Sequence, residues 1–436
     1  MKRLVDTLVD LPYPDHRLAV ALSGGPDSAA LLHSLVAVHG AKRVRAIHVC
    51  HHLQPQAEAW AAHCAQLCAD WHVSFTRLDV CVDVRAEGME ASARRARYRV
   101  LAQALDTGEQ LAVAHHADDQ AETFLIQALR GAGVHGLAGM PSVKALGAGW
   151  LWRPWLTVPQ AAIARYVVEH GLAVINDPSN IDTAVDRGYI RQALWPAVQT
   201  RWPAAADTLS RSAGWAAQAA EAVDALAAID LGATSAAAGC LSIAALAELS
   251  CARRGQVYRR WIAQAGRDCP DHRHVQQIDR LLSVREHASP RVVYAHTEIR
   301  RFDGRLFVMS RLPLAPDATL AWGGGLSTIE LPAGAGKLSL TDGSSVAQSP
   351  PHTEELTVRF RRGGEQLIER DGRMIALKDW FQSHRVPPWL RERAPLIWWQ
   401  DQLIAVADCW LQRDCAQWPA GRVLSFCWQH DMPTGR

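Results

Sequence analysis

The chain has 436 residues, of which 49% are hydrophobic and 21% are charged, and its formal net charge is +2. Because a single hydrophobic core stops growing near ~250 to 300 residues, this length predicts a folded protein of two to three domains. Charges or Gly/Pro clusters interrupt every apolar run before the ~18 residues that a membrane span needs. The first 14 residues carry Asp6 and Asp10 where a secretion signal would be apolar. We therefore expect neither membrane insertion nor secretion, and the small net charge does not by itself indicate nucleic acid.

Ten cysteines are scattered along the chain without a dense disulfide pattern. This pattern predicts reduced, mostly buried thiols and a cytoplasmic protein. Two histidine pairs, His51-His52 and His115-His116, raise the question of zinc. No cysteine or acidic spacing completes a tetrahedral ligand set around them, so a zinc site is not expected.

The first half alternates short apolar runs with helical patterns, which predicts a parallel sheet with helices on both faces. In such sheets ligands bind at the carboxyl ends of the strands. The expected strands are 18–22, 44–50, 73–80 and 111–115, and the expected helices are 28–38, 57–70, 89–105 and 118–129.

The residue composition and the hydrophobic pattern change in the second half of the chain. An Ala-rich stretch from about 203 to 247 and the patterns at 253–263 and 274–282 predict helices. Residues 291–310 predict strands that turn at Asp303-Gly304. The Gly, Pro and Ala-rich segment near 312–336 has no clear period, so it is either a linker or irregular edge structure. The expected division is a catalytic α/β domain over 1–205, a mostly helical domain over 206–312, this segment over 313–336, and a small strand-rich α+β domain over 337–436.

A glycine-rich loop between the first strand and the first helix is the strongest local signal. Its amides, with the helix amino end, are suited to wrap an anion, and its serines supply hydroxyls. No Gly-Lys-Ser/Thr follows, so it is not the loop that most NTPases use to transfer a γ-phosphate. The alternative is an ordinary Gly/Ser turn. The residues are Ser23, Gly24, Gly25, Pro26, Asp27 and Ser28.

Acidic residues open the helix after the fourth strand. Asp119 and Glu122 lie three residues apart and share one helix face, where two carboxylates can bind Mg²⁺ or receive an ammonium ion. The alternative is that Asp118 caps the helix and the other acids favour its dipole. Because both histidine pairs end strands, they are expected to face one crevice.

Two further segments are candidates for the same crevice. Arg94 and Tyr98 are four residues apart on the third helix, so one face of that helix can enter the site while the other arginines stay solvated. Asp177 and Asn180 either form an Asp-Pro turn or line the crevice and read a substrate amine.

Basic residues of the second half are candidates for contacts with RNA phosphates, and tryptophans interleave with some of them. Most of the 17 tryptophans are nevertheless expected in cores. One basic segment spans 253–260. The others contain Arg359, Arg361, Arg362, Arg385, Arg391 and Arg393, near Trp380, Trp389, Trp398 and Trp399.

The order of these motifs resembles the tRNA(Ile)-lysidine synthetase family, and the loop at 23–28 resembles that of the N-type ATP pyrophosphatases. The segment 114–140 discriminates best, and the resemblance covers nearly the full length, most weakly between about 205 and 250. It rests on SGGPDS (23–28), HVCHHL (48–53), ARRARY (93–98), AHHADDQAETFLIQALRGAGVHGLAGM (114–140), WRPWL (152–156), DPSNID (177–182) and LKDWFQSHRVPPWLRERAPLIW (377–398).

The resemblance implies a two-step ligation. The oxygen at carbon 2 of the wobble cytidine in a CAU-anticodon isoleucine tRNA attacks the α-phosphate of ATP and expels pyrophosphate. The ε-amine of free L-lysine then displaces AMP to form lysidine, which changes codon specificity from AUG to AUA.

The resemblance also implies roles for individual residues. Catalysis falls to Asp27, Asp119, Glu122 and Arg94, with Asp27 also a ligand of Mg²⁺, and ATP lies on Ser23 to Ser28. The lysine pocket comprises His115, Asp119, Glu122, Asp177 and Asn180, and the tRNA contacts comprise Arg359, Arg361, Arg362, Lys378, Arg385 and Arg391.

One departure is Gly188, where the family usually has Asn after the residue matching Arg187. Three rival functions stay open: a tRNA thiolation enzyme, which commonly needs paired cysteine motifs missing here; a non-catalytic RNA-binding module; and a small-molecule synthetase, which would act without RNA. The oligomeric state is open between a monomer and a homodimer.

Overall fold

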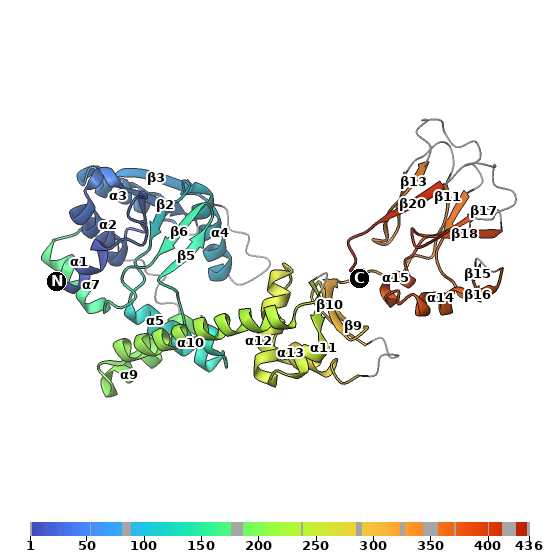
Figure 1. The fold of residues 1–436 in the computed structure, drawn as a ribbon. Coiled ribbons are helices and arrows are strands. Elements are labelled where there is room, and N and C mark those ends of the chain that lie inside the picture. The colour runs from blue at the N-terminus through green and yellow to red at the C-terminus, as the bar shows by residue number, and fades with distance from the viewer. Residues whose placement is uncertain are drawn as a thin grey trace. The chain divides into compact units, whose positions relative to one another are not determined.

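The computed structural model describes residues 2–52, 54–80, 89–175, 186–236, 239–284, 290–322, 328–342, 356–369, 372–399, 401–411 and 424–433. The chain divides into two compact units, Met1–Ala222 and Val223–Arg436. Each unit is described by itself (Figure 1). Every helix in the described ranges is too short or too polar to cross a membrane.

The first unit is built on a six-stranded sheet with the order β3-β2-β1-β4-β6-β5. All neighbouring strands run parallel except β5, which forms an antiparallel hairpin with β6 at one edge. The strands are β1 (Leu18–Ala21), β2 (Val44–Cys50), β3 (Ser74–Asp79), β4 (Gln110–Ala112), β5 (Val143–Leu146) and β6 (Gly149–Trp152).

Helices cover both faces of this sheet because alternate strand residues point to opposite sides. Leu18 and Val20 of β1 belong to a core with residues of α1, α2, α3 and α7, whereas Ala19 packs in a second core with Leu101 of α4 and with Leu105, which follows that helix. Figure 1 shows the sheet between these helix layers. The helices are α1 (Lys2–Val9), α2 (Pro26–His39), α3 (Ala57–Asp70), α4 (Met89–Ala104), α5 (Ala117–Leu129), α6 (Val134–Leu137), α7 (Gln160–Glu169), α8 (Asp186–Tyr189), α9 (Trp195–Arg201) and α10 (Ala205–Thr234), with a 3₁₀ turn at Ala41–Arg43 and a π-helical segment at Ile190–Leu194.

The second unit begins with the end of α10 and a helical layer on a four-stranded antiparallel sheet of order β7-β10-β9-β8. The hairpin of β9 and β10 turns at Asp303 and Gly304, both with positive φ, as the sequence predicts. The elements are β7 (Leu241–Ser242), α11 (Ile243–Ala247), α12 (Cys251–Gln264), α13 (His272–Arg280), β8 (Arg291–Tyr294), β9 (Thr297–Phe302) and β10 (Arg305–Ser310).

The rest of the second unit is rich in strands. One sheet has the order β11-β14-β17-β18-β19, a second has β12-β13-β20, and β15 pairs with β16. The elements are β11 (Thr319–Trp322), β12 (Thr328–Leu331), β13 (Gly336–Asp342), β14 (Leu356–Arg359), β15 (Gln366–Ile368), β16 (Met374–Ala376), α14 (Leu377–Ser383), α15 (Pro388–Arg391), β17 (Leu396–Trp399), β18 (Gln402–Val406), β19 (Trp410–Leu411) and β20 (Leu424–Gln429).

The predicted fold class is confirmed: a parallel sheet between helices, then a helical region, then small antiparallel sheets. The segment 312–336, predicted as a linker or irregular edge structure, contains two regular strands, β11 and β12. They pair with β14 and β13, and this pairing compensates for the weak strand pattern of their own sequences. The expectation of buried thiols holds for only some of the described cysteines. Cys50, Cys64, Cys68 and Cys240 are buried, while Cys251, Cys269, Cys409 and Cys427 are exposed.

Candidate active site

The glycine loop closes through its own serines. The Ser28 hydroxyl donates to the Gly25 carbonyl at 3.1 Å and accepts from the Ser23 amide at 3.1 Å, and the two serine hydroxyls lie 3.0 Å apart. Pro26 begins α2, where its fixed φ suits the first helical turn and its missing N–H costs nothing. The loop therefore presents its backbone at the carboxyl end of β1 and the amino end of α2.

Gly24 is required by both its conformation and its surroundings. Its φ is +87°, and an added Cβ would lie 2.5 Å from Cδ1 of Ile175 and 3.0 Å from Sγ of Cys64. The Ile175 amide also donates to the Gly24 carbonyl at 2.9 Å. A residue with a side chain would thus clash with the chain segment that closes over the loop.

The amino end of α5 is capped by a histidine. The Asp119 amide donates to Nδ1 of His116 at 3.4 Å, and the His116 amide donates to the Asp119 carboxylate at 3.1 Å, which is a reciprocal capping box. The prediction that Asp118 caps the helix is wrong, because its carboxylate instead accepts from the amide of Gln160 at 2.9 Å. Asp119 is thereby fixed at the helix start, buried, beside His116.

Two arginines from a distant part of the chain meet the acidic face of α5. Arg191 donates to Asp119 at 2.7 Å and to Glu122 at 2.6 Å, and Nε of Arg187 lies 3.3 Å from Glu122. Arg191 belongs to the π-helical segment, a local departure from α-helical winding of the kind that is frequent at functional sites. A cation therefore already lies against both carboxylates.

Asp27 belongs to the same group of charges. Its carboxylate lies 3.9 Å from Nε2 of His116, which joins the glycine loop to the start of α5. Burial raises the pKa of Asp27, an effect that His116 opposes and Asp119 reinforces.

The two carboxylates of α5 differ in proton affinity. Burial raises the pKa of Glu122 in spite of its bonds to Arg191. Burial also acts to raise that of Asp119, but the charges of His116 and Arg191 hold the pKa of Asp119 below its usual range. Asp119 thus stays ionised to a lower pH than Glu122. Neighbouring acids whose pKa values differ in this way can take different chemical roles.

His115 lies on the side of the site that faces α4. Its Nδ1 accepts from Nε of Arg153 at 3.2 Å, and burial lowers its pKa to about 3, with Arg153 and Arg94 acting in the same direction. The Arg94 guanidinium lies over the ring of Tyr98, 5.1 Å from its centroid. Arg94 and Tyr98 thus lie on one face of α4, as their four-residue spacing predicts, and the entry of this face into the site stays a prediction. The low pKa makes His115 a neutral imidazole at physiological pH.

The structure brings together most of the predicted residues of this site. It joins the glycine loop, Asp119 and Glu122, while Asp177 and Asn180 lie outside the described residues. Four partners were missing from the sequence-based set: His116, Arg153, Arg187 and Arg191. The four-residue spacing of Arg187 and Arg191, one helical turn, was the available signal.

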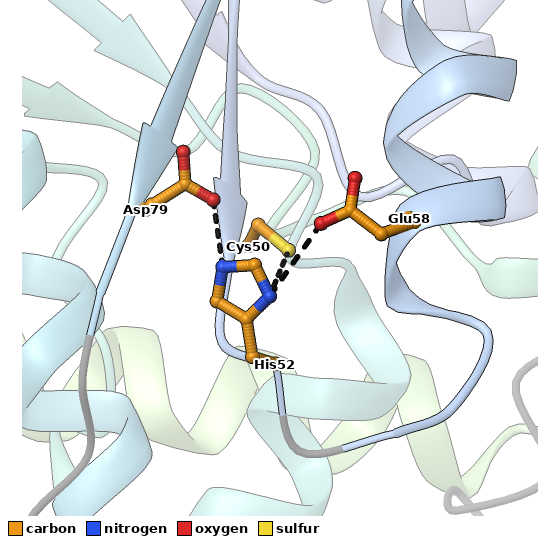
Figure 2. Close-up of side chains that lie close together, drawn as sticks. All are labelled: Cys50, His52, Glu58 and Asp79. Carbon is orange, nitrogen blue, oxygen red and sulfur yellow. Dashed lines mark hydrogen bonds and ion pairs between the residues drawn. The ribbon is translucent and has the colours of Figure 1, made fainter.

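The two histidine pairs have different hydrogen-bond partners, and the shared crevice that their positions predict stays a prediction. β1 lies between β2 and β4, the strands that the pairs follow. His51 accepts from Arg97 at 3.1 Å, and His52 contacts Cys50, Glu58 and Asp79 (Figure 2). The spacing in the sequence did not indicate this group of side chains, because Glu58 and Asp79 reach His52 from other elements.

In the second unit, the described arginines near the C-terminus fall into two groups. Arg362 is paired with Asp317 at 2.7 Å, and Arg385 with Asp303 at 3.3 Å, both at exposed positions. Arg361 lies 4.0 Å from Glu365, and Nε of Arg391 donates to the carbonyl of Val386. Burial, together with the charge of Arg361, lowers the pKa of Arg391.

Arg359 stacks on the indole of Trp398 at 5.0 Å, and Lys378 is exposed on α14. Trp380 and Trp389 are buried in the core and cannot stack on a base, whereas Trp398 and Trp399 are only partly buried. In the segment 253–260, Arg253 pairs with Asp230 and Arg254 with Asp279. Arg259 instead donates to the carbonyl of Pro270.

Three family models match successive parts of the chain. Residues 1–198 match a PP-loop domain, residues 241–307 match the TilS substrate binding domain, and residues 356–428 match the TilS substrate C-terminal domain. Together they cover the glycine loop, the helical layer and the sheet that carries Arg359.

Curated relatives match along almost the whole length. A tRNA(Ile)-lysidine synthase of Pectobacterium atrosepticum is 35% identical over 414 residues, covering 94% of each chain. One of Xanthomonas campestris pv. campestris is 38% identical over 427 residues, covering 96% of this chain and 97% of the relative. Among solved structures, a U34-tRNA thiolase from Methanococcus maripaludis with its [4Fe-4S] cluster is 16% identical, with a TM-score of 0.41, over 49% of this chain and 76% of that one.

Proposed function

The chain belongs to the tRNA(Ile)-lysidine synthase family and uses ATP to form lysidine on an isoleucine tRNA; we propose that the cluster around Asp119 and Glu122 carries out this ligation. The observation that supports this assignment most strongly is the position of two buried carboxylates beside the glycine loop. The tRNA is the isoleucine tRNA with a CAU anticodon, the amine is free L-lysine, and the reaction takes place in the cytoplasm.

In the first step the glycine loop holds the phosphates of ATP. The amides of the loop and the amino end of α2 stabilise the negative charge that develops on departing pyrophosphate. Arg94 contributes a guanidinium that can contact a phosphate or the lysine carboxylate with two N–H donors.

The donor set beside the loop fits Mg²⁺. Asp27 is a carboxylate whose raised pKa reflects burial and the nearby negative charges of Asp119 and Asp118, and a hard divalent cation relieves that repulsion. Bound there, Mg²⁺ supplies further neutralisation of phosphate charge. Asp27 would hold it through a carboxylate oxygen.

In the second step the amine of lysine attacks carbon 2 of the adenylated cytidine and AMP leaves. The ammonium group is received by Asp119 and Glu122, which already bind one cation, the guanidinium of Arg191, through one oxygen each. His115 lines the pocket as a neutral imidazole, and Asp177 and Asn180 complete the set.

The amine must lose a proton before it attacks. Glu122 suits this task because its raised pKa makes it the better proton acceptor of the two carboxylates. Asp119, which stays ionised, holds the positive charge in place until the proton has moved. The two acids therefore divide anchoring and proton transfer between them.

The second unit binds the tRNA. Arg361 and Arg391 are the principal phosphate contacts, because a bound phosphate would relieve the repulsion that the charge of Arg361 exerts on Arg391. Glu365, 4.0 Å from Arg361, offsets only part of this charge. Arg359 and Lys378 extend this surface, while Arg362 and Arg385 must give up Asp317 and Asp303 to take part. We assign residues 1–205 to catalysis on the anticodon loop. Residues 206–312 and 337–436 are assigned to tRNA binding.

Pyrophosphate release tests the proposal. Purified protein is mixed with ATP and a CAU-anticodon isoleucine tRNA transcript, with and without lysine, beside Asp119→Asn, which keeps an oxygen for the capping box. We expect release that requires this tRNA, entry of labelled lysine into the RNA only in the wild type, and a folded but inactive variant. Release without RNA, or equal lysine incorporation by Asp119→Asn, contradicts the assignment.

A further inference from the structure

A second cluster of polar side chains lies at the carboxyl edge of the sheet, away from Asp119. Cys50 and Asp79 end β2 and β3 and are paired in the register of the two strands. Glu58 lies in the first turn of α3, and His52 follows β2. Their ligand atoms all lie within 4.8 Å of one another (Figure 2).

The imidazole of His52 has different neighbours at its two nitrogens. Nδ1 lies 3.7 Å from Sγ of Cys50 and 3.6 Å from Oε1 of Glu58, while Nε2 lies 2.7 Å from Oδ1 of Asp79 (Figure 2). A tetrahedral zinc ion, with bonds of ~2.0 to 2.3 Å, separates its donor atoms by roughly 3.3 to 3.6 Å. The distances from Nδ1 to the other two donors are therefore close to those that a zinc ion would impose, and the whole group lies within 4.8 Å.

We propose that Cys50, His52 and Glu58 bind a zinc ion that nothing in the ligation reaction requires, with water as the fourth ligand. Nδ1 of His52 is the metal-binding nitrogen. Asp79 accepts the hydrogen bond from Nε2–H, which fixes the tautomer and the ring orientation, as carboxylates commonly do for metal-bound histidines. Thiolate, imidazole and carboxylate are all ligands that zinc takes in proteins.

Charge balance favours this occupant. Arg77 bonds Glu58 at 2.7 Å with each of its terminal nitrogens, and Asp79 at 2.7 Å. Both carboxylates therefore form ion pairs with the same guanidinium. One arginine leaves one negative charge uncompensated; a zinc ion and a Cys50 thiolate together bring the cluster to neutrality, and the thiol proton passes to solvent.

The cluster is accessible and local. The side chains of His52, Glu58 and Asp79 are 47%, 65% and 52% exposed, whereas Cys50 is buried. An ion can therefore enter from solvent and join the ends of β2 and β3 to α3. Its function is structural: it fixes the edge of the sheet beside the strand that leads into the glycine loop.

Metal titration of the full chain tests the proposal. After treatment with a chelator, the protein is titrated with zinc by calorimetry and with Co²⁺ by absorption, where a thiolate ligand produces an intense charge-transfer band. The variants are His52→Gly, Cys50→Ser and Asp79→Asn, with Cys269→Ser as the matched exposed-thiol control. Because the φ of His52 is +53°, glycine suits its backbone and the fold is retained, which a melting curve verifies.

We expect one zinc per chain and a cobalt band in the wild type and in Cys269→Ser, and loss of both in His52→Gly and Cys50→Ser. Asp79→Asn is expected to weaken zinc binding by about 10-fold to 100-fold. A wild type without the band, or a band that persists in folded His52→Gly, overturns the proposal. If Cys50→Ser does not fold, His52→Gly decides the matter.

Discussion

Nε of Arg191 lies 2.6 Å from Oε1 of Glu122, although the two residues are 69 positions apart in the sequence. The same guanidinium reaches Asp119 through its NH2 group. Because both carboxylates are buried, this one arginine keeps two like charges together and limits the directions from which a substrate can approach them.

Replacing Arg191 by Gln is expected to destabilise the first unit, because it leaves two buried carboxylates without their shared cation. We expect a loss of roughly 1 to 3 kcal/mol in the free energy of unfolding at neutral pH. The loss should shrink as the pH is lowered and Glu122 takes up a proton, which urea unfolding at several pH values measures. Arg130→Gln breaks an exposed pair with Asp186 and is the control, with a change of at most about 0.5 kcal/mol. Equal losses in the two variants would contradict the role assigned to Arg191.

Glu122→Gln is expected to separate the two chemical steps. Loss of a proton acceptor slows lysine transfer by ~10²- to 10⁴-fold, while adenylation continues and adenylated tRNA accumulates. Quenched-flow assays that follow pyrophosphate and lysidine separately test this, with the exposed Asp186→Asn as the control. In the wild type the rate of the second step should rise with pH through the raised pKa of Glu122. A parallel fall in both products would show that Glu122 acts earlier.

His115 is expected to make folding sensitive to acid. Its pKa is about 3 in the folded protein and 6.5 ordinarily, so between these values the unfolded chain binds a proton that the folded one does not. Its contribution to stability is therefore complete above pH 6.5 and decreases as the pH falls towards 3. His115→Asn, which keeps an acceptor for Arg153, should show a flatter dependence of unfolding free energy on pH over this range. An unchanged slope, or a His115 ring that titrates in NMR between pH 5 and 8, would refute the neutral imidazole.

Gly24→Ala is expected to disturb the glycine loop. The residue has a positive φ, and its new methyl group would overlap Cδ1 of Ile175, so we expect a loss of about 1 to 3 kcal/mol in unfolding free energy. Gly25→Ala is the matched control for stability, since its Cβ meets nothing closer than 3.6 Å and its φ is −71°. Chemical denaturation of both variants distinguishes them. If Gly25→Ala is the less stable of the two, the close approach at Gly24 is not what constrains the loop.

Arg361→Ala and Arg391→Gln are expected to weaken tRNA binding by about fivefold each, the equivalent of roughly 1 kcal/mol. If each arginine contacts a phosphate, the negative slope of the log binding constant against the log salt concentration should become shallower by ~0.7 to 0.9 per variant. Filter binding of the isoleucine tRNA at several salt concentrations measures both quantities. Lys337→Ala, which removes a cation already paired with Glu330, should leave affinity and slope unchanged. A fall in affinity with an unchanged slope would indicate a structural role instead.

Much of the first unit follows from local pattern. The alternation of short apolar runs and helical spacings places β1 to β4 and α2 to α5 within a few residues of their observed bounds. The β5–β6 hairpin was missed, because these strands add to an edge of a sheet that already exists and carry little signal of their own. Strands β11 and β12 were missed for a similar reason, since tertiary pairing overrides weak local preference.

The sequence by itself determined the order of the motifs, the family and the residue types available at the carboxyl edge of the sheet. Only the tertiary structure decided which of those residues meet. Arg191 reaches Asp119 and Glu122, and Cys50 meets Glu58 and Asp79, because separate elements end at the same edge. Spacing along the sequence predicts neighbours within one helix or strand, whereas charges from different elements are brought together by tertiary packing. Packing also buries Asp119 and Glu122 to different effect, so that their pKa values differ.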